Sequence, residues 1–191
     1  MTAATDPAQA LKDRAQIRDC LMRYCRGVDR FDPDLIKSAY HPDGFDDHGI
    51  FAGNGWVFAD WIGPFDDSIG VEHQIHRVDN VLITFKGADV ALVESYNITF
   101  VQAQTPDGPA SALVGGRYLD RFEKRGGAWK IAHRRYVMDW NINGPATARW
   151  AGAFFGAVGH GRTDAQDPSH AMLQQLSPAP GQGHGNKSFR P

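Results

Sequence analysis

Charge of one sign, long apolar runs and cysteine are all scarce in this chain. Its 20 Lys and Arg residues nearly balance 22 Asp and Glu residues, so it lacks the basic excess typical of nucleic-acid binding. No segment approaches the ~20 apolar residues of a membrane span, and no N-terminal apolar run resembles a signal peptide. We therefore expect a cytoplasmic globular protein with neither nucleic acid nor a membrane among its partners.

The two cysteines, Cys20 and Cys25, do not form a recognisable site. Their spacing does not place them on one helix face, as a metal-binding or redox pair would require, so we expect free thiols in a reducing compartment. The chain also lacks a serine nucleophile elbow, a GxGxxG fingerprint and a Walker loop. These absences favour acid–base chemistry without a cofactor, or ligand binding alone.

Hydrophobic periodicity is the strongest signal that is present. Residues 115–140 alternate with period 2 on both sides of Gly126-Gly127, which predicts two long strands joined by a tight turn. The same reasoning, with Pro and Gly as boundary signals, predicts the other elements. Helices are expected at 8–27, 32–42 and 53–64, and strands at 43–51, 71–85, 90–104, 112–124 and 129–141.

This element order predicts an α+β fold. Consecutive hairpins make one twisted antiparallel sheet, and the first helix can bury its apolar stripe only against the concave face of that sheet. The result is a cone-shaped α+β barrel with a pocket between sheet and helices. Composition changes after residue 144, which divides the chain into a cone domain (1–144), an aromatic arm or lid (145–160) and a largely disordered tail (161–191).

Two histidines on the strand expected at 71–85 are candidates for chemistry. Alternation sends His73 and His76 to opposite faces, so they cannot chelate one metal ion. His76 becomes a general base only if a carboxylate reaches it. Asp29, at the end of the first helix, is one such group, although its neighbour Arg30 favours a surface ion pair instead.

A second cluster is Asp46-Asp47-His48. Alternation puts Asp46 and His48 on one face, but a metal site would need a further ligand that the motifs do not supply, so capping or sheet-edge hydrogen bonds are expected. In the last strand Arg134 and Tyr136 share a face. The aromatic residues that could line the cone, or belong to its core, include Phe45, Trp61, Tyr96 and Tyr136.

Over residues 8–143 the chain resembles the SnoaL-like branch of the nuclear-transport-factor-2-like superfamily. The resemblance is carried by Tyr24-Cys-Arg-Gly-Val-Asp29, His41-Pro-Asp-Gly-Phe-Asp-Asp-His48-Gly, His76-Arg-Val-Asp-Asn80, Glu94-Ser-Tyr96 and Gly116-Arg-Tyr-Leu-Asp-Arg-Phe-Glu. It implies the cone fold and a homo-oligomer, a trimer or dimer, formed through the convex face of the sheet. It says less about the substrate, because this fold hosts enzymes and binding modules alike.

Dehydrochlorinase and dehydratase members of that superfamily imply roles for individual residues. By this resemblance His76 abstracts a proton, Asp29 orients it and Arg134 helps the leaving group depart, while Tyr24 matches an active-site tyrosine. Tyr24, Arg134 or His48 would protonate or bind the departing oxygen. The substrate-binding set would be His48, Tyr96, Tyr136, Trp61 and Phe45.

The leading hypothesis is a cofactor-independent lyase without a metal. It would remove water, or a small fragment such as formaldehyde, from a hydroxylated aromatic or polycyclic substrate, as in the catabolism of aromatic compounds. Two alternatives stay open: a ketosteroid-type isomerase, and a non-catalytic ligand-binding or small-subunit module.

Overall fold

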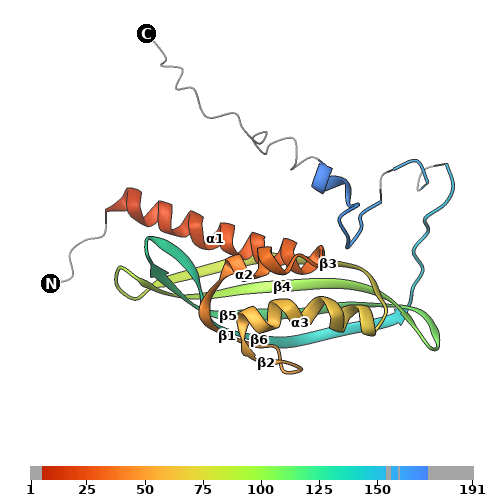
Figure 1. Ribbon diagram of the computed structural model, residues 1–191, viewed down its shortest axis with the longest axis horizontal. Helices are drawn as coiled ribbons and strands as arrows, with labels where there is room; N and C mark the ends of the chain where they lie inside the picture. The colour runs from red at the N-terminus through yellow and green to blue at the C-terminus, as the bar shows by residue number, and fades with distance from the viewer. Residues whose placement is uncertain (1–5, 154–155, 159, 172–191) are drawn as a thin grey trace, which may run out of the picture.

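The computed structural model describes residues 6–153, 156–158 and 160–171 (Figure 1). Helices and strands follow one another in the predicted order, except that a short strand that was not predicted precedes the third helix. The helices are α1 (Pro7–Asp29), α2 (Pro33–Ala39) and α3 (Gly55–Ser68). The strands are β1 (Tyr40–Asp47), β2 (Ala52–Asn54), β3 (Val71–Phe85), β4 (Val90–Thr105), β5 (Gly108–Arg125) and β6 (Ala128–Pro145).

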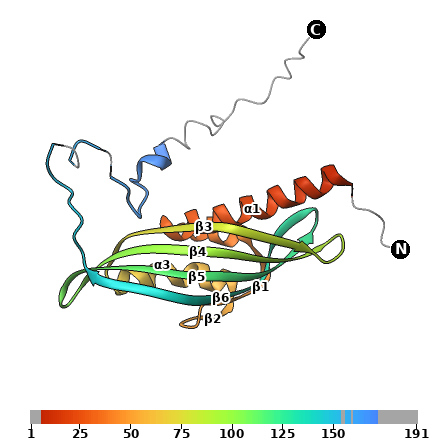
Figure 2. The same cartoon turned by 180° about the vertical axis from the view of Figure 1, so that it is seen from behind.

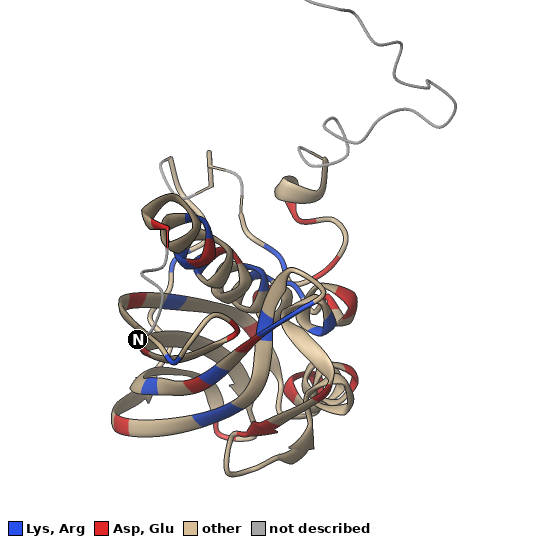
Figure 3. Ribbon diagram, turned by 90° about the vertical axis from the view of Figure 1, so that its left-hand side faces the viewer, with Lys and Arg blue, Asp and Glu red and all other residues tan. Residues whose placement is uncertain are grey.

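The strands form one six-stranded sheet in the order β2-β1-β6-β5-β4-β3. Strands β1 and β6 run parallel, and the other neighbours are antiparallel. The helices cover one face of this curved, unclosed sheet, and Figure 2 shows that no described helix covers the opposite face along β3 to β6. The predicted α+β architecture is confirmed. Basic and acidic residues are interspersed over the elements (Figure 3), and no described helix combines the length and apolarity needed to cross a membrane.

Helix α1 contributes most of the helical residues of the hydrophobic core. Asp6 caps its start by accepting a 3.1 Å hydrogen bond from Ala8 N, and Pro7 occupies the first turn. Its buried apolar residues, Ile17, Cys20, Leu21, Tyr24, Cys25 and Val28, recur at helical spacing and pack with strand residues such as Val93, Phe122 and Ile131. Leu11, which the apolar pattern assigned to this stripe, is 70% exposed instead.

The predicted helix end at Gly27 is wrong, because α1 continues to Asp29. Gly27 is small because α2 crosses it closely: a Cβ there would lie 2.7 Å from Ile36 Cγ1. Gly27 therefore marks a close contact between α1 and α2 and does not mark the end of α1. The two extra residues place Asp29 on the last turn of α1, facing β3.

Two other boundaries differ from the prediction. Helix α2 ends at Ala39, so β1 begins at Tyr40, three residues earlier than expected, and pairs with β6 from there. Helix α3 begins at Gly55, where Asn54 caps it, and passes through Pro64 to Ser68. Proline removes one helical hydrogen bond but does not end this helix. The extra turn carries Asp66 to β3.

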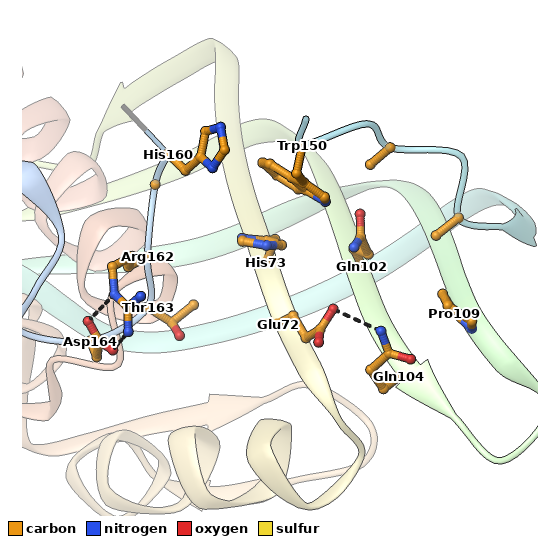
Figure 4. Close-up of a pocket in the computed structure, with 13 residues that line it drawn as sticks. Glu72, His73, Gln102, Gln104, Pro109, Trp150, His160, Arg162, Thr163 and Asp164 are labelled. Atoms are coloured by element: carbon orange, nitrogen blue, oxygen red, sulfur yellow. Dashed lines mark hydrogen bonds and ion pairs between the residues drawn. The ribbon is translucent and has the colours of Figure 1, made fainter. Parts of the chain in front are cut away.

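The chain after β6 crosses the outer face of the sheet (Figure 4). Trp150 stacks on His73, with 4.6 Å between ring centroids, and a hollow of about 760 Å³ lies between this segment and the ends of β3 and β4. Further along, Ser169 accepts a hydrogen bond from Arg26, and Asp167 lies 3.4 Å from Arg30. Ser169 of the predicted tail thus contacts α1 and Asp167 contacts the residue that follows it, whereas Phe154 and Phe155 of the predicted arm, and 172–191, lie outside the described residues.

Candidate active site

A cavity of about 250 Å³ lies between the helices and the concave face of the sheet. It is smaller than the hollow in Figure 4, but four of the residues that the sequence singled out line it: Tyr24, His48, His76 and Tyr136. Its apolar wall consists of Val28, Ile50, Phe58, Ile62, Val101 and Val114. Its polar groups include Tyr24, His48, Asp66, Gln74, His76 and Tyr136. A few polar groups on an apolar wall are typical of a small-molecule site.

His76 and Asp29 form a hydrogen-bonded pair in this cavity. His76 Nδ1 lies 2.7 Å from Asp29 Oδ1, and the backbone N–H of His76 donates to both oxygens of the same carboxylate, at 3.0 and 3.1 Å. Asp29 is buried, so the alternative of a surface acid paired with Arg30 does not hold. A carboxylate at Nδ1 favours the tautomer with its proton there, which leaves Nε2 as the basic atom.

A second histidine–carboxylate pair lines the same cavity. His48 Nδ1 lies 2.5 Å from Asp46 Oδ1, and the fully buried Asp46 also accepts a hydrogen bond from the Tyr40 hydroxyl. His48 Nε2 lies 3.3 Å from the Tyr24 hydroxyl. Strand alternation predicted the shared face of Asp46 and His48, and the resemblance placed His48 in the site, but Asp46 was expected only to form capping or sheet-edge hydrogen bonds.

Tyr24 stands between the second pair and a buried cation. Burial raises the pKa of its phenol well above the usual value, the Asp46 carboxylate adds to the rise, and Arg134 opposes it. The phenol therefore keeps its proton at neutral pH and can donate a hydrogen bond. Its ring packs edge-on against Tyr118, with centroids 5.7 Å apart.

Arg134 does not line the cavity, although the resemblance placed it against the leaving group. It is fully buried behind the wall and makes two hydrogen bonds to Asp120, at 2.8 and 2.7 Å. Its guanidinium carbon lies 4.1 Å from the ring centroid of Tyr24 and 3.9 Å from that of Tyr118. In this structure Arg134 contacts Tyr24 and supports it from behind.

The predicted aromatic lining holds for one residue of four. Tyr136 lines the cavity and stacks on His48, with centroids 5.5 Å apart. Phe45 stacks on His133 and Tyr96 is 46% exposed; neither lines the cavity, because each is next in sequence to an inward residue, Asp46 or Asn97, and so points to the other face.

Trp61 packs among other aromatic residues and does not line the cavity either. Its ring lies 5.2 Å from Phe51, 6.2 Å from Phe58 and 4.5 Å from Phe65, measured between centroids. Trp61 therefore stabilises the packing of α3 from behind the residues that line the cavity.

Sequence reasoning missed Asp66 and gave Gln74 no role. Gln74 Nε2 donates to Asp66 Oδ2 at 2.9 Å and to the Val28 carbonyl at 3.1 Å, which ties α3 and α1 to β3. The position of Gln74 on the face of His76 was readable from alternation. Asp66 was hidden because the helix that carries it was expected to end at Pro64.

Comparison with known proteins places this fold in a family. A LinA-type3 hexachlorocyclohexane dehydrochlorinase from Novosphingobium barchaimii LL02 superposes with a TM-score of 0.64 at 22% identity, covering 78% of this chain and 100% of that one. A protein from Novosphingobium aromaticivorans DSM 12444 with a provisional scytalone dehydratase assignment gives 0.62 at 16% identity, covering 75% and 94%.

Another similar structure carries no assigned activity. A single-residue variant of Rv3472, a protein of unknown function from Mycobacterium tuberculosis, gives a TM-score of 0.58 at 23% identity, covering 72% of this chain and 78% of that one. No curated protein matches the chain by sequence. Likeness at these identities shows the fold and not the reaction. The model of the SnoaL-like domain matches residues 9–135, and the chain therefore belongs to the SnoaL-like family.

Proposed function

We propose that this protein is a cofactor-independent lyase that eliminates water, or a small fragment such as formaldehyde, from a hydroxylated aromatic substrate. The observation that carries the proposal is that two histidine–carboxylate pairs, His76–Asp29 and His48–Asp46, line one largely apolar cavity. One pair removes a proton from the substrate, and the other protonates the oxygen atom that leaves. The names of two similar structures, a dehydrochlorinase and a provisional dehydratase, support an elimination.

The dehydration starts at His76. Its unprotonated Nε2 takes a proton from a substrate carbon, and Asp29 stabilises the imidazolium that forms. The electron pair left on that carbon becomes the new C=C bond as the C–O bond on the neighbouring carbon breaks. The departing hydroxide takes a proton from the His48–Tyr24 pair and leaves as water. Proton return from His76 to that pair through solvent restores both groups.

The cavity favours a compact substrate. Its volume of about 250 Å³ lies just below the ~300–1,000 Å³ typical of ligand pockets. Its wall offers Phe58 and Tyr136 rings for an aromatic substrate to pack against. We therefore propose one- or two-ring hydroxylated aromatic compounds ahead of larger polycyclic ones.

We also propose that the protein works as a homo-oligomer, a trimer ahead of a dimer. The outer face of the sheet carries exposed large apolar side chains, among them Leu82, Leu92, Tyr96, Phe100 and Leu119. A patch of this kind typically marks an interaction surface.

The proposed function is tested by a mass-resolved turnover screen with no cofactor added. Wild type, His76→Ala and His73→Ala are incubated with hydroxylated one-ring, two-ring and steroid compounds. We expect wild type and His73→Ala to release a product lighter by water or formaldehyde, and His76→Ala to be slower by about 10²–10⁴-fold. His73 is the matched control, because it lies on the same strand but faces Trp150 on the other side.

Each other outcome points to a different class. His76→Ala should fold, because Asp29 still accepts from the backbone N–H of residue 76, and its melting temperature checks this. A product of unchanged mass would indicate an isomerase. If wild type converts nothing while the same compounds raise its melting temperature, the lyase proposal is wrong and a binding module takes its place.

A further inference from the structure

A carboxyl group on α3 reaches the cavity and takes no part in the two histidine–carboxylate pairs. Asp66 lines the cavity, and only 7% of it is exposed. Its Oδ2 accepts a 2.9 Å hydrogen bond from Gln74, and among the described residues Gln74 is the one hydrogen-bond donor to this carboxyl. Gln74 lies two residues before His76 on the same face of β3.

The hydrogen bonds that Gln74 makes to α3 and α1 do not by themselves require a carboxyl group at position 66. Gln74 links Asp66 to the Val28 carbonyl at the end of α1, and for this link position 66 has to supply only one acceptor oxygen. The amide of an asparagine would supply that oxygen without the larger cost of burying an ionisable group. The link to Gln74 uses only one oxygen of Asp66. A proton on the second oxygen is therefore available to a ligand in the cavity.

We propose that Asp66 is a proton-donating group of this cavity, and that its neutral carboxyl donates a hydrogen bond to an oxygen atom of the bound substrate. The inference rests on the proposed function in that the cavity binds an oxygenated compound. It adds that the substrate carries a second oxygen, an acceptor such as a carbonyl, besides the one that leaves. Gln74 fits both states of Asp66, since its N–H donates to a carboxyl oxygen whether or not the other oxygen is protonated.

The surroundings of Asp66 agree with this role. Burial raises the pKa of its carboxyl, and the Gln74 hydrogen bond and the nearby His76 oppose the rise. The other titratable groups on the cavity wall are Tyr24 on α1, His48 after β1, His76 on β3, Tyr118 on β5 and Tyr136 on β6, and Asp29 lies behind His76. Burial raises the pKa of all three tyrosines, so they stay neutral. The test must therefore separate Asp66 from the two histidines.

The test combines a titration with a binding measurement. Carboxyl carbon resonances of labelled protein are followed against pH, and the Asp66 signal is assigned by its loss in Asp66→Asn. Affinity for 1-indanone, a neutral two-ring ketone, is measured calorimetrically from about pH 4 to 9 for wild type, Asp66→Asn and His76→Ala. We expect Asp66 to titrate above the ordinary ~3.9. Over the same pH range the wild-type affinity should fall by up to about tenfold.

Asp66→Asn should not show this fall in affinity, because its amide N–H donates a hydrogen bond at every pH and its amide oxygen still accepts from Gln74. His76→Ala should keep this fall in affinity but move it to higher pH, because His76 no longer opposes the rise of the Asp66 pKa, so failure of the lyase screen and failure of this inference are separate results. Gln74→Leu gives a second readout: without its donor the pKa of Asp66 rises further. The inference is overturned if Asp66 titrates at or below its ordinary value, if wild type and Asp66→Asn share one pH dependence, or if wild type does not bind the ketone.

Discussion

Asp29 shows how a single residue connects the backbone to the chemistry. Its carboxylate accepts from the backbone N–H of His76 and lies 2.7 Å from the ring of the same residue. The position of the ring therefore depends on the contact between the end of α1 and β3. A carboxylate held in this way fixes the tautomer of its histidine and stabilises the imidazolium that forms.

Replacement of Arg134 distinguishes a structural role from a catalytic one. Arg134→Met leaves the fully buried Asp120 without its partner, which should lower the free energy of unfolding by about 3–5 kcal/mol in urea titrations. The double variant Arg134→Met/Asp120→Leu should recover most of that loss, because neither charge then remains buried. If Arg134 instead serves the leaving group, as the resemblance implied, the single variant would lose turnover and keep its stability.

At the residue scale, the sequence contained more information about the site than the prediction used. The pairing of Asp29 with His76 and the place of His48 in the site came from the resemblance, and alternation placed His48 on the same face as Asp46. The outward orientation of Phe45 and Tyr96 follows from the same alternation, applied to their neighbours Asp46 and Asn97. Asp66 could not be placed in this way, because the face that a helix buries depends on how it docks.

At the scale of elements, the bounds of β3 and β4 were predicted well, whereas the helix ends and the bounds of β1 were not, and β2 was not predicted. The bounds of β3 match the expected 71–85, since alternation and flanking glycines act locally. Gly27 and Pro64 misled the prediction because both are read as helix breakers, and both lie inside helices here. Whether a helix continues through such a residue depends on tertiary contacts, which a local sequence pattern does not show.

Substitution of the glycine in α1 tests this interpretation. Alanine normally stabilises a helix interior by about 0.5–1 kcal/mol relative to glycine. Gly27→Ala should instead destabilise by about 1–3 kcal/mol, since its Cβ would lie 2.7 Å from Ile36 Cγ1 and 2.9 Å from the Ile36 backbone nitrogen. The matched control is Gly63→Ala in α3, whose Cβ would meet Phe31 at an ordinary 3.7 Å. Equal effects of the two variants on thermal unfolding would contradict a close helix contact at residue 27.

At the scale of the whole molecule the sheet has two unlike faces. Helices and the cavity occupy the concave face, whereas the outer face of β3, β4 and β5 carries exposed leucines. Leu82, Leu92 and Leu119 line a hollow of about 500 Å³ there. Because this hollow and the cavity lie on opposite faces, association through the outer face leaves the site free.

This arrangement makes the assembly testable apart from the chemistry. We expect wild type to elute as an oligomer in size-exclusion chromatography with light scattering. Leu92→Lys should shift it toward the monomer, because burying an unpaired ammonium group in an interface is costly. Leu11→Lys is the control, since Leu11 is also an exposed leucine but lies on α1. A monomeric wild type, or the same shift in both variants, would remove the outer face as the interface. The His76–Asp29 pair would remain within one chain in either case.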